Sequence, residues 1–152
     1  MNHDNPIEEV WNLLAGQRKR LVESFYDNLF IRFPHYHQYF PEHMEPQTER
    51  MMDLVGSVAR FSNQINLIRP YLLKVGESHK TIQLKLEDLC NFRDVFIDTV
   101  AETCGASWEE RHAEAFREAF DDTIIPIVHE GLSGPSIDRD CSDFRVNVAL
   151  HS

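Results

Sequence analysis

The chain has 152 residues and a formal net charge of −10. This length fits one domain whose core is large enough to enclose a small ligand. The negative charge argues against a protein that binds nucleic acid through its phosphates, because a polyanion would be repelled over most of the surface. Since 42% of the residues are hydrophobic, with ten Phe and only six Gly, we expect a folded rather than a disordered chain.

The cysteines and the N-terminus bear on the cellular location. Cys90, Cys104 and Cys141 are an odd number without CxxC spacing, which indicates neither a disulfide framework nor a thiolate metal site. A reducing cytoplasm is therefore the expected location. The first residues lack the basic and apolar regions of a signal peptide, and no stretch reaches the roughly 18 apolar residues that a membrane span needs. We expect neither export nor membrane insertion.

Helical periodicity and prolines divide the first half of the chain. Asn5 can cap a first helix that begins at Pro6, and a denser apolar stripe predicts a second helix that stops at Pro34. The aromatic stretch 35–40 is short enough to be a single turn or a corner. Pro46 can begin a third helix, whose apolar positions continue until Pro70, which we expect to end or redirect it. A short helix then carries His79.

The second half of the chain predicts two more long helices. An amphipathic segment at 86–100 should end near Gly105, and Ser107 can cap the last helix with Glu110 three residues on. We expect Pro126 to kink or end that helix. Because no stretch alternates like a strand, the predicted fold class is all-α, with one domain at 1–132 and a polar, flexible C-terminal tail at 133–152.

A histidine near the end of a short helix is the residue with the clearest chemistry. A neutral imidazole binds haem iron well, and its other nitrogen can donate to a carbonyl one turn back, such as that of Val75. Apolar residues surround His79 in the sequence, as a porphyrin face requires: Val75, Ile82, Leu84, Leu89 and Phe92. From this motif alone, a helix-end histidine without any ligand fits equally well.

Three motif blocks follow one another with consistent separations. They are FYDNLF at 25–30 followed by Pro34 and Phe40, QTERMM at 47–52, and LLKVGESH at 72–79. In this order they resemble a bacterial single-domain globin, related to the globin domain of flavohaemoglobins, over residues 7–132. The resemblance implies a globin fold of about six to eight helices around haem b, with His79 as the iron ligand. Because no CxxCH sequence is present, we expect haem without thioether bonds.

The resemblance also implies roles for residues distant from His79. It places Phe40 against the porphyrin, although ordinary aromatic packing in the core is the alternative for this residue. It places Tyr26, Gln47 and Met51 over the ligand site, where a hydroxyl and an amide can each donate to bound dioxygen for roughly 1–3 kcal/mol. Tyr26 could instead reach backbone, and Gln47 could be an exposed first-turn residue. In a register shifted by one turn, Arg50 and Leu54 would replace Gln47 and Met51.

The remaining candidate ligands carry less information. His35, His37 and His43 cluster near the corner, but no acidic or thiolate partner completes a metal site, so surface histidines are favoured. Cys90 and Cys104 are interpreted as small buried apolar residues.

The resemblance implies binding and transport of O₂, and binding of NO and CO. Oxidation of NO to nitrate is the leading reaction, and it would depend on an external reductase because the chain has no room for a flavin domain. Leu89 stands where the flavohaemoglobin pattern has a tyrosine next to the histidine, which weakens the case for a dedicated enzyme. A haem-based gas sensor that signals to a partner protein is the alternative. A globin-like domain without haem is a third hypothesis, which an absorption spectrum would test.

Overall fold

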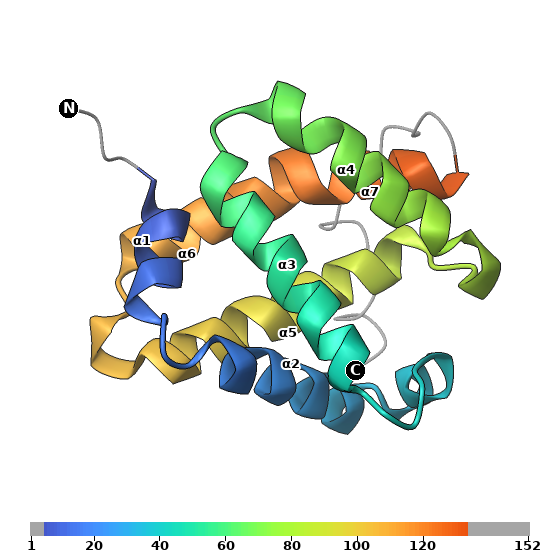
Figure 1. Cartoon of the computed structure of the whole chain (residues 1–152), viewed down its shortest axis with the longest axis horizontal. Coiled ribbons are helices and arrows are strands. Elements are labelled where there is room, and N and C mark those ends of the chain that lie inside the picture. Colours follow the sequence, from blue (N-terminus) through green and yellow to red (C-terminus); the bar gives the residue numbers. More distant parts are fainter. Residues whose placement is uncertain (1–4, 134–152) are drawn as a thin grey trace, which may run out of the picture.

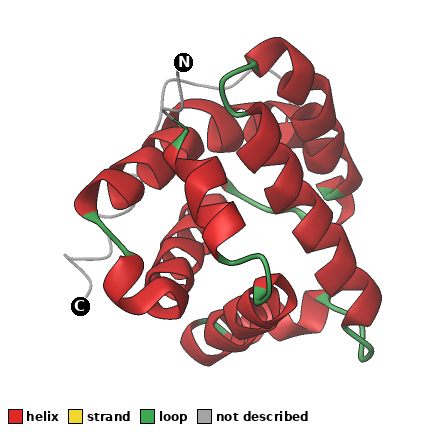
Figure 2. Ribbon diagram, turned by 60° about the vertical axis from the view of Figure 1, so that its left-hand side comes forward, coloured by secondary structure: helices red, strands yellow, loops and turns green. Residues whose placement is uncertain are grey.

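The fold is described from a computed structural model, which covers residues 5–133 (Figure 1). Within these residues the chain forms seven α-helices joined by short turns and by 3₁₀ and π segments, and it contains no strand (Figure 2). The prediction of an all-α fold with six to eight helices is therefore confirmed for this part of the chain. The predicted tail lies, apart from Ser133, outside the described residues, so the proposed domain boundary stays a prediction.

The first two helices follow the sequence signals closely. Helix α1 (Pro6–Leu13) begins as predicted, since the side-chain oxygen of Asn5 accepts a hydrogen bond from the backbone N–H of Glu8. Helix α2 (Arg18–Arg32) ends just before the proline at 34, also as predicted. The aromatic corner is a 3₁₀ helix, η1 (Pro34–Tyr39).

The prediction that Pro70 ends the third helix is wrong. Helix α3 (Glu45–Phe61) stops earlier, where three polar residues form a turn in which the N–H of Gln64 donates to the carbonyl of Phe61 at 2.8 Å. Helix α4 (Ile65–Ser78) follows and contains Pro70. Pro70 is exposed and removes a single backbone hydrogen bond from α4. The packing of α4 on its neighbour outweighs that cost.

Helix α4 packs on α7 (Ile125–Ser133), and a glycine in each helix allows the two backbones to approach closely. A Cβ atom on Gly76 would collide with the carbonyl oxygen of Val128, and one on Gly131 would collide with the carbonyl oxygen of Leu73. The backbones of the two helices are therefore in direct contact. An ion pair of 2.7 Å between Arg69 and Glu130 joins the same helices at the surface.

Helix α5 (Leu86–Cys104) ends at Gly105, whose φ of +56° suits glycine, in agreement with the predicted stop. The predicted cap at Ser107 is wrong, because a 3₁₀ turn, η3 (Gly105–Ser107), occupies that residue. Helix α6 (Glu110–Glu118) is capped two residues later, at Glu109, whose backbone N–H donates to the ring Nδ1 of His112 at 3.0 Å.

The last helical stretch accommodates Pro126 without ending. A π-helical segment, η4 (Ala119–Ile124), separates α6 from α7, so Pro126 is the second residue of a new α-helical segment. A π turn relaxes the regular hydrogen-bond ladder at the place where proline cannot donate. The predicted disruption is thus confirmed, but the helical path continues behind α3 and α4 (Figure 1).

The core consists of two clusters of buried apolar residues. The first lies between α1, α2, α3, α6 and the middle of α5. The second lies between the end of α3, α4, the start of α5 and α7. Phe92 and Phe120 pack against both clusters. Among the described residues, no helix combines the length and the hydropathy that a membrane crossing requires.

Candidate functional site

His79 caps the C-terminal end of α4, and its ring is half-buried. Its Nδ1 atom lies 2.7 Å from the carbonyl oxygen of Val75, and the hydroxyl of Ser78 donates to the same carbonyl at 2.9 Å. Because a carbonyl only accepts, Nδ1 must carry the hydrogen. In the neutral ring, Nε2 therefore keeps its lone pair, and no described side chain hydrogen-bonds to it. This is the tautomer that a metal ligand needs.

The local fold explains why the ring is held in this way. The contact at Gly76 anchors the last turn of α4 against α7, three residues before His79. After His79 the chain tightens into a 3₁₀ turn, η2 (Lys80–Ile82), and reverses at Gln83, whose φ is +56°. The histidine thus stands at a helix end that is fixed from both sides.

Tyr26 and Gln47 meet across α2 and α3. The side-chain amide of Gln47 donates to the hydroxyl oxygen of Tyr26 at 3.1 Å. Tyr26 is 6% exposed, and burial raises the pKa of its hydroxyl, so the group is a protonated donor at neutral pH. None of the described residues accepts the hydrogen of this hydroxyl. Tyr26 therefore reaches a side chain rather than backbone, and its hydrogen is available to a ligand.

The contact also bears on the two registers that the sequence left open. Gln47 is half-buried and bonded to Tyr26, whereas Arg50 is exposed. Met51 packs on the first core cluster, which contains Tyr26, and Leu54 packs on the second. Gln47 rather than Arg50 is thus hydrogen-bonded to Tyr26, while the charge of Arg50 acts on the same hydroxyl and lowers its pKa. Which of the two lies over a bound ligand stays a prediction.

Phe40, which was predicted to contact the porphyrin, lies close to Tyr26. The ring of Phe40 meets the ring of Tyr26 edge-on, with 5.3 Å between centroids, and meets Phe30 at 5.2 Å. Phe40 is only half-buried although it packs on the core. This arrangement fits both of the alternatives considered for Phe40, because both of them bury one side of the ring.

The residues predicted to contact the cofactor divide between the two core clusters. Phe40 and Met51 belong with the first, Val75, Leu84 and Leu89 belong with the second, and Phe92 touches both. Ile82 is half-buried in η2 and joins neither cluster. Five of these side chains pack on the core and still keep accessible apolar surface: Phe40, Met51, Val75, Leu84 and Phe92. Such faces, together with a free imidazole nitrogen, suit a flat apolar cofactor that carries a metal.

A hydrogen-bonded tyrosine near Phe92 was missed by the sequence reasoning. Tyr36 is 2% exposed, its hydroxyl donates to a carboxylate oxygen of Asp88 at 2.5 Å, and Asn91 donates to that hydroxyl at 2.9 Å. Burial, followed by the carboxylate, raises the pKa of Tyr36 strongly. Its ring meets Phe92 at 5.1 Å. Tyr36 therefore fixes η1 to the first turns of α5.

Two buried polar residues were also missed, and both join helices. Arg93 is 1% exposed and its guanidinium binds Asp94 and Asp121, which links α5 to η4. The ring Nε2 of His112 donates to a carboxylate oxygen of Glu9 at 2.8 Å, which links α6 to α1. No local pattern in the sequence indicates the bonds to Asp121 and Glu9, because both partners lie in other helical segments.

The other candidate ligands are dispersed. His35, His37 and His43 are all exposed, and no group of three His, Cys, Asp or Glu side chains within residues 5–133 is arranged to hold a metal ion. Cys104 is half-buried, and burial raises the pKa of its thiol.

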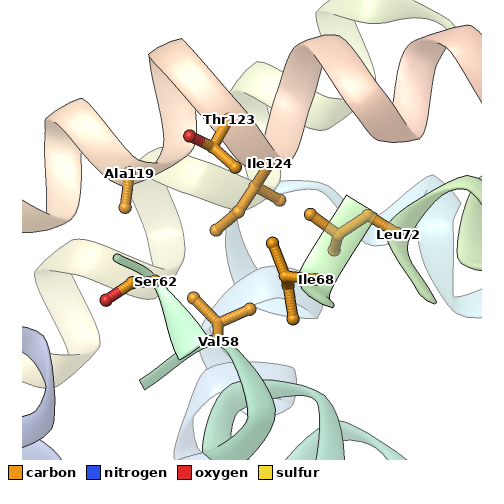
Figure 3. Close-up of a pocket in the computed structure, with 7 residues that line it drawn as sticks. All are labelled: Val58, Ser62, Ile68, Leu72, Ala119, Thr123 and Ile124. Carbon is orange, nitrogen blue, oxygen red and sulfur yellow. The ribbon is translucent and has the colours of Figure 1, made fainter. Parts of the chain in front are cut away.

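A small cavity of about 30 Å³ lies between α3, α4 and η4 (Figure 3). Its lining is mostly apolar but includes Ser62 and Thr123, and it has room for a molecule of about the size of water. None of the residues predicted to bind a cofactor or ligand lines it. The cavity is therefore separate from the candidate site.

The sequence that contains Tyr26, Gln47 and His79 matches a known protein family. The family model described as Globin matches residues 23–126, more than half of the chain and including all of these side chains. No curated protein matches the chain.

Proposed function

The chain belongs to the globin family, and on this basis we propose that it binds haem b through His79 and takes O₂, NO or CO on the side of Tyr26. One observation carries the proposal. The bond from Nδ1 of His79 to the carbonyl of Val75 leaves Nε2 as a free lone pair at a half-buried helix end. This is the tautomer in which an imidazole can bind a metal through Nε2.

The residues present fit the cofactor. When bound, haem supplies an iron atom that takes a diatomic ligand reversibly. His79 would hold the iron, and the apolar faces of Phe40, Met51 and Phe92 would exclude water from the ring. Val75, Ile82, Leu84 and Leu89 would complete the surface on the side of the histidine.

Tyr26 would act on the bound ligand. Its hydroxyl oxygen already accepts a hydrogen bond from Gln47, so its own hydrogen is free to be donated to a ligand. Bound dioxygen carries partial negative charge and accepts such a bond, whereas CO hardly does. The pair Tyr26–Gln47 would therefore favour O₂ over CO.

Oxidation of NO is the reaction that this pair supports best. One NO, one dioxygen and one electron together give one nitrate, so the reaction would need an electron donor. The Tyr–Gln pair would hold dioxygen until NO arrives. We propose that an external reductase supplies the electron. No contact among the described residues favours the alternative of a gas sensor.

Visible spectra of the purified full chain in its ferric, ferrous and CO-bound states test the cofactor. In the variant His79→Gly we expect haem retention to fall at least tenfold and added imidazole to restore a low-spin spectrum. The matched control is His35→Gly, which removes an exposed histidine from η1. If both variants kept the spectrum of the unmodified chain, His79 would not be the ligand.

A further inference from the structure

The backbone contact between α4 and α7 lies next to His79. Gly131 of α7 is so close to α4 that a Cβ atom on it would collide with the carbonyl oxygen of Leu73 and would lie 3.1 Å from the Cα of Gly76. A Cβ on Gly76 would in turn collide with the carbonyl oxygen of Val128. The two helices lie side by side along this contact (Figure 1). At these two glycines, no layer of side chains separates the backbones.

Two hydrogen bonds tie His79 to the same turn of α4. Its backbone N–H donates to the carbonyl oxygen of Gly76 at 3.0 Å, and its ring Nδ1 donates to the carbonyl oxygen of Val75 at 2.7 Å. The hydroxyl of Ser78 donates to the carbonyl of Val75 as well. Because both bonds of the histidine end on this turn, a movement of the turn is passed on to the imidazole.

The contact is also held closed on both sides. The ion pair between Arg69 and Glu130 joins the helices at the surface, one residue before Gly131, and Leu72 and Val128 are buried together in the second core cluster. Side chains at a helix interface can change rotamer to relieve a small displacement, whereas backbone atoms in contact have no such freedom. An atom added at this place must therefore separate the helices.

We propose that Gly131 is a positioning residue for the haem iron ligand. Its lack of a side chain lets α7 hold the last turn of α4 at the place from which His79 bonds to iron. The inference rests on the proposed function, because it requires that His79 binds the iron. It adds that α7, a helix in which no residue was predicted to contact the cofactor, sets the strength of that bond.

The size of the displacement explains why the iron bond would respond. An alanine at position 131 would have to move the backbones apart by about 1 Å to bring its Cβ to van der Waals distance from the carbonyl oxygen of Leu73. Bonds between a metal and its ligands keep to within about 0.2 Å of their preferred length. A shift of the turn that carries His79 would thus be felt at the bond before it unfolds the helix.

The test uses resonance Raman spectra of the full haem-loaded chain in its ferrous state without added ligand, where the iron–histidine stretching band reports the strength of the bond. In Gly131→Ala we expect this band to shift and the association rate of CO, which hardly responds to Tyr26, to change about threefold or more. Gly76→Ala adds the same methyl group from the other helix and should shift the band too. It replaces Gly131→Ala if that variant does not retain haem.

A destabilising control separates positioning from stability. Ile127 of α7 is 4% exposed in the second core cluster, so Ile127→Ala removes packing from the same helix without adding an atom at the contact. We expect this control to lower the free energy of unfolding at least as much as Gly131→Ala and to leave the band in place. Equal shifts in both variants would overturn the proposal, because Gly131 would then act only through the stability of α7.

Free imidazole provides a second readout, which a merely structural role would not change. In the variant His79→Gly, added imidazole takes the place of the histidine ring without a covalent link to α4. We expect Gly131→Ala to leave the iron–imidazole band unchanged in this background. A shift as large as the one seen with His79 in place would show that Gly131 acts on the haem by another route, and it would overturn the proposal.

The outcomes keep the two proposals apart. A chain that retains haem and loses it in His79→Gly, but whose band is the same in Gly131→Ala and Gly76→Ala as in the unmodified chain, would overturn the positioning role and leave the proposed function intact. A chain that never retains haem, or whose spectrum is unchanged in His79→Gly, would contradict the proposed function. The visible spectra show this before any variant of α7 is compared.

Discussion

The side-chain amide of Gln47 donates a hydrogen bond of 3.1 Å to the hydroxyl oxygen of Tyr26, from the first turns of α3 to the middle of α2. This bond occupies the oxygen of the tyrosine and leaves its hydrogen free. The direction of the bond makes the two residues unequal, with Tyr26 as the donor to a ligand and Gln47 as the residue that orients it.

Replacing Tyr26 with Phe deletes this donor and keeps the ring. We expect O₂ to dissociate roughly ten- to hundredfold faster, which corresponds to a lost hydrogen bond of about 1.5–3 kcal/mol, while CO dissociation hardly changes. Stopped-flow measurements of both ligands check this, with Tyr39→Phe, an exposed tyrosine, as the control. Equal small changes for O₂ and CO would show that Tyr26 points elsewhere.

Replacing Gln47 with Leu tests the orienting role and the register of α3. Because the residue acts through Tyr26, we expect O₂ dissociation to rise less than in Tyr26→Phe, by about three- to tenfold. The matched variant Arg50→Leu, one turn further on and exposed, should leave the rate within twofold. A larger effect from Arg50→Leu would favour the shifted register.

The contact between α4 and α7 predicts an unfavourable Gly76→Ala substitution. In an exposed helix, alanine would stabilise by about 1 kcal/mol, but here its Cβ would meet the carbonyl oxygen of Val128, a backbone atom that cannot yield. We expect a net loss of about 1–3 kcal/mol in the free energy of unfolding, measured with denaturant. Gly56→Ala is the control, since that Cβ would lie 3.4 Å from the Trp11 ring. Similar stabilities of the two variants would contradict the close contact.

The ion pairs of Glu9 predict that the free energy of unfolding decreases at acidic pH. Hydrogen bonds from Arg111, then from His112, lower the pKa of Glu9 to about 2 from an ordinary 4.5. A depressed carboxyl pKa contributes stability above pH 4.5, which is lost as the pH falls towards 2. Because Glu9 is partly exposed, solvent screening keeps the contribution below about 1 kcal/mol. Glu9→Gln should therefore lose less stability than the unmodified chain between pH 5 and pH 3, as measured by chemical denaturation.

Truncation tests the predicted domain boundary. A chain that ends at Leu132 lacks only the last residue of α7 among the described residues. We expect it to fold and to bind haem with an unchanged spectrum, because the sequence beyond it has no helical period. Loss of haem uptake on truncation would show that residues 133–152 are part of the domain.

Local signals in the sequence predicted the helices well where a single residue decides the geometry. Asn5, Pro34 and Gly105 mark helix ends in the structure because a cap, a missing N–H and a positive φ act within one turn. The prediction was wrong at Pro70 and at Ser107, where the outcome depends on other segments. Packing against α7 keeps α4 helical through Pro70, and a 3₁₀ turn displaces the cap of α6 to Glu109.

The candidate site shows the same division. The sequence by itself determined which residues could serve a cofactor, because ordered motif blocks placed His79, Tyr26 and Gln47 in a family pattern. Only the tertiary structure decided that Gln47 rather than Arg50 meets Tyr26, and that Gly76 lies against α7. It alone brought Tyr36 to Asp88 and Glu9 to His112. Those contacts join residues far apart in the chain, and their formation depends on how helices cross, which no local propensity encodes.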